Sequence, residues 1–324
     1  MITTNKTGMP NYLLEWANGK NNEHRPPTFD SISTTQIIKD PTACVLLMRH
    51  SNEVEIDLQD TADQNTGSAI HKDILETAER LGGFIEQRLE EEFEVDGEKF
   101  LLTGHIDLYD PNGKFLHDIK TSKLTTFDKN KSGKDDEWKD QLTVYVKLLY
   151  DLKPYWFRGI DEIANLVNIK DLAKVKEAKA GNSTDKWRMI HYDWDEMTTR
   201  TSEVMEKIFE NVRAVRKLWD TPDEELPICS EKYRYVDVKF KVYKRKSPNS
   251  SEHNKTAVSG HANYESYEDA LNGFNAAGFT DKDYVIEKTG SESTKCIYFC
   301  ELKDFCPHYR QMMNKEASNE TSES

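Results

Sequence analysis

The sequence predicts an α/β fold in which helices flank a central mixed β-sheet. Three observations support this class. Segments with apolar residues at helical spacing alternate with strand-like segments over residues 31–222. Two neighbouring strand-like segments are joined by a tight turn of the Asn-Gly type, which is typical of a β-hairpin. With 324 residues, 36% of them hydrophobic, the chain is long enough to bury one large core.

The N-terminal elements precede the hairpin. Residues 1–30 are polar and rich in Pro and Asn, which predicts an irregular arm, and a short helical region is expected between Ser31 and His50. The small-residue segment Gly67-Ser68-Ala69 then opens a long helix, because the apolar residues after it follow helical spacing. These residues are Ile70, Ile74, Leu75, Ala78, Leu81 and Phe84.

Three strands follow this helix, and the last two form the predicted hairpin. Its turn is Asp110-Pro111-Asn112-Gly113, in which each residue type favours a tight reversal of the chain. The three predicted strands are Glu90–Asp96, Lys99–Leu108 and Phe115–Thr121.

The second half of the core repeats this alternation. The segment Lys123–Asp136 is rich in Lys, Asp, Ser and Gly, which predicts a mobile loop, and a helix is expected from Trp138 to about Leu152. Two strands follow, Ile163–Ile169 and Trp187–Trp194. Asp195 then caps a long amphipathic helix that ends near Trp219.

The character of the chain changes after Pro222. Residues 223–314 are expected to form a subdomain with a small ββαβ unit, and residues 315–324, rich in Ser, Glu and Asn, a disordered tail. The predicted elements are strands Tyr233–Tyr243, Thr256–Tyr264 and Tyr284–Lys288 and a helix Ser266–Ala277 with Ser266 as its cap.

The bulk composition limits the class of protein. No apolar run approaches the length of a membrane span and the N-terminus lacks a signal-peptide core, so we expect a soluble cytoplasmic protein with no membrane partner. The net charge of −14 argues against a general polyanion-binding surface. Basic runs remain at Lys120–Lys134 and Lys239–Lys246, and either a solvated edge or a binding surface would explain them.

Polar residues interrupt both strands of the hairpin. Asp107 lies on the first strand, and Asp118 and Lys120 lie two apart on the second, so the latter two share a face. Two carboxylates and an ammonium are costly in a buried sheet unless something compensates them. A divalent cation would compensate the carboxylates, with Lys120 beside a metal-bound water. This arrangement is typical of a metal-dependent phosphodiester hydrolase.

Further residues complete the predicted site. His71 on the preceding helix and the backbone carbonyl of Ile119 are expected to join Asp107 and Asp118 around Mg²⁺ or Mn²⁺, and an imidazole ligand favours Mn²⁺. Lys120 would position the water, take its proton if its own pKa is depressed, or stabilise the transition state.

Gln141 and Tyr145 are i and i+4 on the following helix, so they share one face. Facing the hairpin, they would hold Lys120 or the nucleotide backbone. Asp-x-Lys by itself is common, and a lone His or Gln-x-x-x-Tyr is ordinary on a helix. The ordered set is what points to function.

The order of these motifs resembles that of the PD-(D/E)XK nuclease superfamily. More closely, it is similar to the RecB-like exonuclease branch, which includes the nucleases of CRISPR adaptation and many phage-encoded relatives. The resemblance covers roughly Ser31 to Pro307. The motifs are Gly67…His71, Gly104-His105-Ile106-Asp107, Asp118-Ile119-Lys120-Thr121 and Gln141-Leu142-Thr143-Val144-Tyr145.

The resemblance implies a restriction-endonuclease-like core over residues 31–222 and divalent-metal-dependent cleavage of DNA. It implies that His71, Asp107 and Asp118 are metal ligands and that Lys120 is the catalytic lysine. Gln141 and Tyr145 would then assist on the substrate side. The acid of the third motif is Asp rather than Glu, which the family pattern allows.

Three of the five cysteines cluster near the C-terminus as Cys296-x₃-Cys300-x₅-Cys306. Three thiolates need a fourth ligand for a tetrahedral Zn²⁺ or a 4Fe-4S cluster, and the candidates are Cys229 and Cys44. The spacing fits either cofactor. Similarity to the phage-type relatives implies an iron–sulfur cluster with Cys229 as the fourth ligand, whereas the CRISPR-linked relatives would favour Cys44.

The leading hypothesis is a DNA nuclease, most simply an exonuclease acting on ends or single strands in recombination, repair or phage DNA processing. If the chain is phage-encoded, its location is the cytoplasm of the bacterial host. Three alternatives remain from the sequence. They are an endonuclease, a catalytically silent nucleic-acid-binding partner of a helicase or recombinase, and a zinc-stabilised interaction protein.

Overall fold

The computed structural model describes residues 2–6, 8–10, 12–15, 28, 31–234, 236, 238–264, 266–290 and 293–322. The chain divides into two compact units. The first comprises Met1–Ile228 together with Asp304–His308, and the second comprises Cys229–Lys303 together with Tyr309–Ser324. The second unit thus begins slightly beyond the boundary expected after residue 222, and a short C-terminal segment belongs to the first unit.

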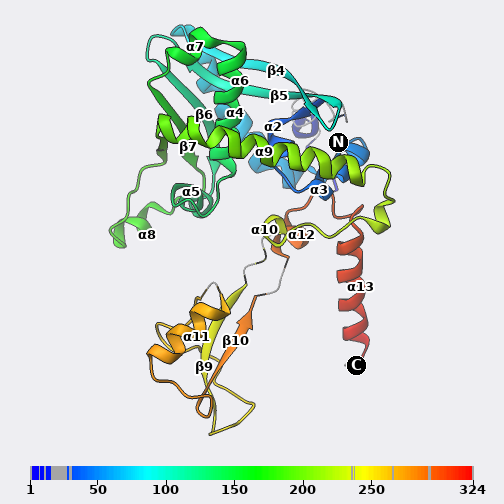
Figure 1. The fold of residues 1–324 in the computed structure, drawn as a ribbon, viewed down its shortest axis with the longest axis vertical. Coiled ribbons are helices and arrows are strands. Elements are labelled where there is room, and N and C mark those ends of the chain that lie inside the picture. The colour runs from blue at the N-terminus through cyan, green and yellow to red at the C-terminus, as the bar shows by residue number, and fades with distance from the viewer. Residues whose placement is uncertain are drawn as a thin grey trace. The chain divides into compact units, whose positions relative to one another are not determined.

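The first unit contains both strands and helices, as expected for an α/β protein (Figure 1). Its strands are β1 (Ile2–Thr4), β2 (Ser31–Ser33), β3 (Glu55–Asp57), β4 (Phe84–Val95), β5 (Glu98–Asp110), β6 (Phe115–Ser122), β7 (Glu162–Ile169) and β8 (Trp187–Tyr192). Its helices are α2 (Thr34–Ile37), α3 (Pro41–His50), α4 (Leu58–Arg80), α5 (Leu124–Lys131), α6 (Glu137–Leu152), α7 (Pro154–Arg158), α8 (Lys174–Lys179), α9 (Trp194–Leu218) and the 3₁₀ turn η1 (Asp223–Glu225).

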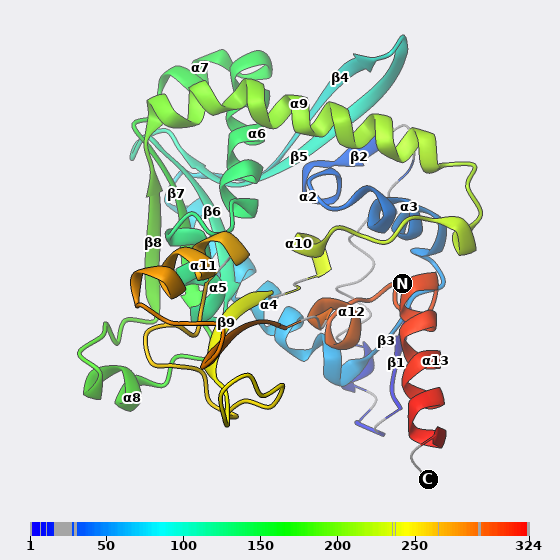
Figure 2. The same ribbon diagram turned by 60° about the horizontal axis from the view of Figure 1, so that its bottom comes forward.

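A mixed six-stranded sheet forms the centre of this unit. Its order is β2-β5-β6-β7-β8, with β4 also paired to β5. The β2–β5 and β6–β7 pairs are parallel, and the β4–β5, β5–β6 and β7–β8 pairs are antiparallel. Figure 2 shows the β4–β5 hairpin extending past the end of the other strands. The prediction of a mixed sheet flanked by helices is confirmed.

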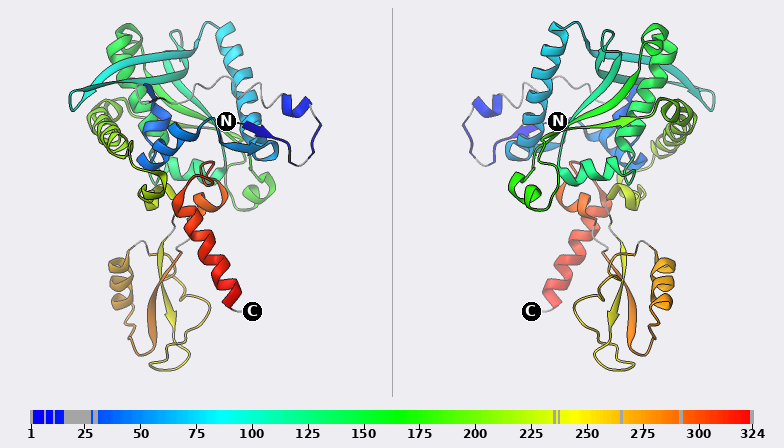
Figure 3. Two further views of the ribbon diagram at one scale, coloured as in Figure 1. Left: turned by 90° about the vertical axis from the view of Figure 1, so that its right-hand side faces the viewer. Right: turned by 90° about the vertical axis from the view of Figure 1, so that its left-hand side faces the viewer.

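Helices cover both faces of the sheet, with α4 on one side and α9 on the other (Figure 3). On the α4 side, Leu75 packs against Leu108 and Ile119 in a buried cluster. On the other side, α6 approaches β5 closely at Gly104, where an added Cβ would lie 3.0 Å from side-chain atoms of Leu148 and Tyr145. Gly104 therefore permits close packing of α6 on the sheet.

Helix α4 is longer than predicted, because it begins at Leu58 rather than at Gly67. After the buried Leu58, its next buried residues are polar: Thr61 donates to the carbonyl of Leu58, and the Asn65 amide donates to the Thr61 hydroxyl. The apolar pattern that predicts a helix is missing there. Gly67 lies within the helix, and a Cβ on it would lie 3.3 Å from Cβ of Thr121 in β6.

Several predicted boundaries in the first unit are wrong. Strand β4 begins at Phe84 rather than Glu90, and the predicted loop Lys123–Asp136 contains helix α5. That helix buries only Phe127 and Asn130, so its apolar signal is weak. Helix α9 is capped by Asp193 rather than Asp195, since the Asp193 carboxylate accepts from the Glu196 amide at 2.9 Å.

The N-terminal arm and two short helices also differ from expectation. Strand β1, inside the predicted irregular arm over residues 1–30, pairs in parallel with β3. Helices α7 and α8 correspond to no element predicted from the sequence. All three are too short for periodicity to reveal them.

The second unit contains an antiparallel β-pair with a helix beside it (Figure 1). Ser266 caps its helix α11 as predicted, with Oγ accepting from the Asp269 amide. Phe240 of the strand meets Tyr267 of the helix edge to face. The elements of this unit are α10 (Glu231–Arg234), β9 (Lys239–Lys244), α11 (Tyr267–Ala276), β10 (Tyr284–Thr289) and α12 (Thr294–Tyr298).

The expected ββαβ order is only partly correct. The segment predicted as a strand from Tyr233 begins as helix α10, and the strand proper starts at Lys239. The described part of Thr256–Tyr264 forms no strand and contributes one isolated bridge, from Tyr264 to Phe240. Helix α13 (Pro307–Ser322) occupies much of the predicted disordered tail. Within the described part of the chain, no helix combines the length and the apolarity that crossing a membrane requires.

Candidate metal centre

The site begins at a gap in the sheet beside strand β5. One edge of β5 pairs with β4, whereas the other pairs with β2 only at Leu101–Thr103 and with β6 only at Leu108–Asp110. Within the described strands, residues 104–107 therefore have no ladder partner on that second edge. Asp107 lies at the end of this gap.

Asp107 bonds across the gap to strand β6. Its Oδ2 accepts a hydrogen bond from the Ile119 amide at 2.7 Å, which replaces the missing backbone partner. Because the N–H and C=O of one strand residue point to the same edge, the Ile119 carbonyl also faces the gap. This orientation is compatible with the predicted role of that carbonyl as a ligand.

Glu86 faces Asp107 from strand β4. The register pairs Ile85 with Leu108 and Gln87 with Ile106, so Glu86 and Asp107 lie opposite each other. Glu86 has a φ of 48°, in the left-handed region that a residue with a Cβ rarely adopts.

Glu86 and its neighbour Ile85 both lie close to helix α4. Ile85 packs in the cluster around Leu75 of α4, and Glu86 lies against His71 of the same helix.

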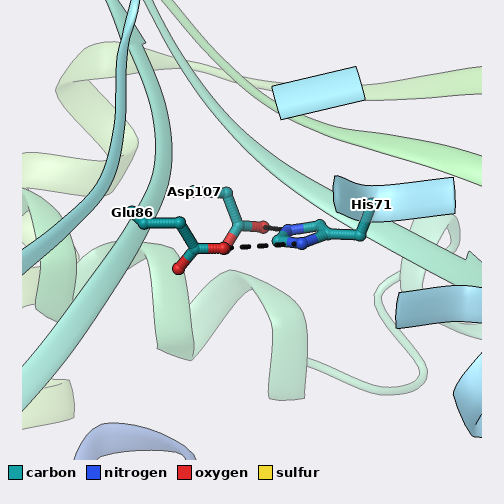
Figure 4. Close-up of side chains that lie close together, drawn as sticks. All are labelled: His71, Glu86 and Asp107. Carbon is teal, nitrogen blue, oxygen red and sulfur yellow. Dashed lines mark ion pairs between the residues drawn. The ribbon is translucent and has the colours of Figure 1, made fainter. Parts of the chain in front are cut away.

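The imidazole of His71 faces the carboxylates of Asp107 and Glu86, which lie side by side (Figure 4). Its Nε2 is 3.1 Å from Asp107 Oδ2, and its Nδ1 is 3.5 Å from Glu86 Oε1. One potential ligand atom from each of the three residues lies within 4.8 Å of the other two. Burial lowers the pKa of His71, but the hydrogen bond and charge of Asp107, followed by the charge of Glu86, outweigh burial and raise it.

Asp118 and Lys120 form a buried network on the α6 side of β6. Lys120 Nζ lies 2.9 Å from Asp118 Oδ2 and donates to Gln141 Oε1 at 2.8 Å. Gln141 in turn donates to the Tyr145 hydroxyl at 2.6 Å. Gln141 therefore holds Lys120 as predicted, whereas Tyr145, 3% exposed, supports Gln141 from behind rather than facing a substrate.

Two residues of this network were not predicted from the sequence. The Asn165 amide donates to Asp118 Oδ2 at 2.7 Å, and the Tyr192 hydroxyl donates to Asn165 Oδ1 at 2.6 Å. Asn165 is fully buried, whereas the other polar residues of β7, Glu162 and Asn168, are only partly buried. A polar residue among the apolar residues of the strand is the signal that the sequence offers for it.

The electrostatics of this network define the state of Lys120. Burial raises the pKa of Asp118 to about 6; Lys120 opposes the rise, and the nearby charge of Asp107 adds to it. Burial lowers the pKa of Lys120, but the charges of Asp118 and Asp107 outweigh burial and raise it above its usual value. The two carboxylates therefore favour the ammonium form of Lys120 over the neutral amine.

The donor set fits a divalent cation. Carboxylates suit Mg²⁺ and Mn²⁺, and an imidazole shifts the preference toward the transition metal. His71 reaches the gap from helix α4, while Asp107 and Asp118 come from neighbouring strands. The structure brings His71 and Asp107 into direct contact and links Asp107 to Asp118 through Ile119 and their mutual charge.

Cys44 is a core residue rather than a ligand. Its thiol is buried in helix α3 and donates to the Gln36 carbonyl at 3.0 Å. Burial raises the pKa of this thiol to about 12. A thiolate, which metal binding requires, is therefore strongly disfavoured there.

In the second unit, Arg234 joins the Cys229 segment to helix α12. It donates to the Cys229 carbonyl and to Ser293 Oγ, both at 2.8 Å, and Ser293 directly precedes the helix that contains Cys296. Cys300 belongs to the same unit and Cys306 to the first. The four-cysteine ligand set stays a prediction.

The sequence matches no family model and no curated protein. Among solved structures, six chains match. One is the crystal structure of SSO0001, with a TM-score of 0.40 and 13% sequence identity over 60% of this chain and 85% of the other. A similarity of this size says nothing about activity.

Proposed function

We propose that this chain is a divalent-metal-dependent deoxyribonuclease, most simply an exonuclease that hydrolyses phosphodiester bonds at DNA ends or in single strands. The observation that carries the proposal is the cationic Lys120, held by Asp118 and Gln141 beside the gap where Asp107 and His71 meet. This combination is the one that the PD-(D/E)XK resemblance implies, on a core of the restriction-endonuclease type.

Each residue has a chemical task in this proposal. His71, Asp107, Asp118 and the Ile119 carbonyl would hold the cation, which supplies a polarised phosphate and an acidified water when bound. Lys120, kept charged by its carboxylate neighbours, would stabilise the negative charge that develops on the phosphate. Gln141 fixes the direction of the Lys120 ammonium, and Tyr145 fixes Gln141.

The decisive experiment is a cleavage assay with the full chain. Linear duplex, circular duplex and single-stranded DNA are incubated with Mg²⁺, Mn²⁺ or EDTA. We expect metal-dependent shortening of linear and single-stranded DNA, with the circular duplex intact. K120A should remove this activity while its circular dichroism spectrum matches that of the wild type. Cleavage by K120A at the wild-type rate would refute the proposal, and nicking of circles would make the enzyme an endonuclease.

We also propose that Cys229, Cys296, Cys300 and Cys306 bind a 4Fe-4S cluster. Protein purified without oxygen should contain iron and acid-labile sulfide and absorb visible light. C296S should lose iron, whereas C44A, the matched control with a buried thiol, should retain it. A colourless protein with stoichiometric zinc would contradict the iron–sulfur assignment.

A further inference from the structure

Glu86 lies outside the predicted ligand set, yet it lies next to that set in the fold. We propose that Glu86 is a third side-chain ligand of the cation, together with His71 and Asp107. The inference builds on the proposed function, since the cation is the one that the nuclease would use.

The geometry of the three residues matches a single ion. Ligands that surround a small divalent cation at about 2.1 Å lie roughly 3–4 Å from their neighbours. One donor atom from each of His71, Glu86 and Asp107 lies within 4.8 Å of the other two, and His71 Nε2 is 3.1 Å from Asp107 Oδ2. Small side-chain adjustments would close such a shell.

The backbone at Glu86 is unusual. Its φ of 48° lies in the left-handed region, and the carboxylate lies against His71. A residue with a Cβ adopts this conformation at an energetic cost, and such costs persist where the surrounding structure holds the side chain in place.

The carboxylate of Glu86 lies near two imidazoles. Its two oxygens are 3.5 Å from His71 Nδ1 and 3.6 Å from His105 Nδ1. The side chain is 45% exposed, so solvent and metal ions reach it. A carboxylate there adds negative charge to a site already formed by Asp107 and Asp118.

The test measures Mn²⁺ binding to the full chain by calorimetry and by the loss of the free-ion electron paramagnetic resonance signal. E86Q should weaken Mn²⁺ binding by about tenfold or more, the smallest loss seen when groups that support metal ligands are removed. The matched control is E90Q, a carboxylate on the same strand that pairs with Arg88 and should bind Mn²⁺ as the wild type does.

E86G separates the backbone from the carboxylate. Glycine adopts φ near 48° without penalty, so this variant should fold at least as stably as the wild type and still lose Mn²⁺ affinity. Wild-type Mn²⁺ affinity in both E86Q and E86G would overturn the inference.

The two proposals fail in different ways. If Mn²⁺ binds and E86Q weakens it while no DNA is cleaved, the nuclease proposal fails and the ligand assignment stands. If DNA is cleaved and both Glu86 variants bind Mn²⁺ normally, only the ligand assignment fails. Absence of Mn²⁺ binding by the wild type overturns both.

Discussion

Two histidine–carboxylate clusters in the first unit use the same residue types in opposite ways. In one, His50 and Arg49 of helix α3 both bond Asp223, at 2.6 and 2.5 Å. In the other, His71 meets two carboxylates, Asp107 and Glu86, and a third, Asp118, adds its charge nearby. In the first cluster two basic side chains converge on one carboxylate, and His50 also contacts Glu53; in the second, one imidazole contacts two carboxylates.

This difference separates a structural cluster from a candidate cation site. Burial raises the pKa of Asp223, but hydrogen bonds and charges from His50 and Arg49 outweigh burial and lower it. Asp223 is thus stabilised by the protein itself. The pKa of Asp118 shifts the opposite way, to about 6, because burial and the charge of Asp107 outweigh the bonds from Lys120 and Asn165. A divalent cation would stabilise the ionised carboxylates at the second cluster.

The largest expected effect comes from neutralising an acid at the second cluster. D118N should lower the rate of DNA cleavage by at least about a hundredfold, because it removes a proposed metal ligand and the carboxylate that pairs with Lys120. The rate is measured on end-labelled DNA with Mn²⁺. D223N is the control and should cleave at the wild-type rate. Equal losses in both variants would abolish the distinction between the clusters.

The same D223N change should instead lower stability. It removes charge-assisted bonds to Arg49 and His50 in a partly buried site, so we expect a loss of about 1–3 kcal/mol in the free energy of unfolding. Urea unfolding followed by fluorescence measures this quantity. An unchanged midpoint would show that the contacts of Asp223 contribute nothing net to the fold.

The stability contribution of Asp223 should depend on pH with a definite sign. Its pKa is lower in the folded state than in the unfolded chain, where Asp titrates near about 3.9. The stabilisation is therefore complete above that value and is lost as pH falls through the lowered folded pKa. The difference in unfolding free energy between the wild type and D223N should be constant from pH 7 to 5 and shrink below about pH 4. A difference that grows on acidification would contradict the assignment.

The smallest effect is expected at the edge of the Asp118 network. Y192F removes the hydroxyl that donates to Asn165, while Asn165 still donates to Asp118. Cleavage should fall by less than about tenfold, in line with the loss of one hydrogen bond worth about 1 kcal/mol. Comparing kcat and KM of Y192F with the wild type tests this, and a loss as large as that of D118N would place Tyr192 in direct contact with the reaction.

The sequence predicted correctly which candidate residues lie on the same face of a strand or helix. Asp118 and Lys120 lie two apart on one strand, and Gln141 and Tyr145 lie one turn apart on one helix, so local periodicity placed them correctly. Glu86 could not be found in this way. It precedes the predicted start of its strand at Glu90, and a left-handed backbone at a glutamate leaves no trace in the residue pattern.

Elements with short or polar buried faces were also missed. The start of α4 buries Thr61 and Asn65, whose mutual hydrogen bond replaces the apolar contacts that a sequence pattern reports. Asn165 was missed because its partners, Asp118 and Tyr192, come from other strands. Pairing between distant segments is decided by tertiary structure, which local propensity does not contain.

The absence of a side chain at Gly67 lets helix α4 pack closely on strand β6. His71 lies one helical turn beyond Gly67 on the same helix. The distance between the α4 backbone and the sheet at Gly67 therefore determines how far the His71 imidazole extends toward the sheet. A single methyl group there would act as a spacer against Thr121 and lift the helix by a few tenths of an ångström. Because catalytic geometry tolerates little displacement of this kind, a substitution at Gly67 would disturb the proposed site through the position of His71.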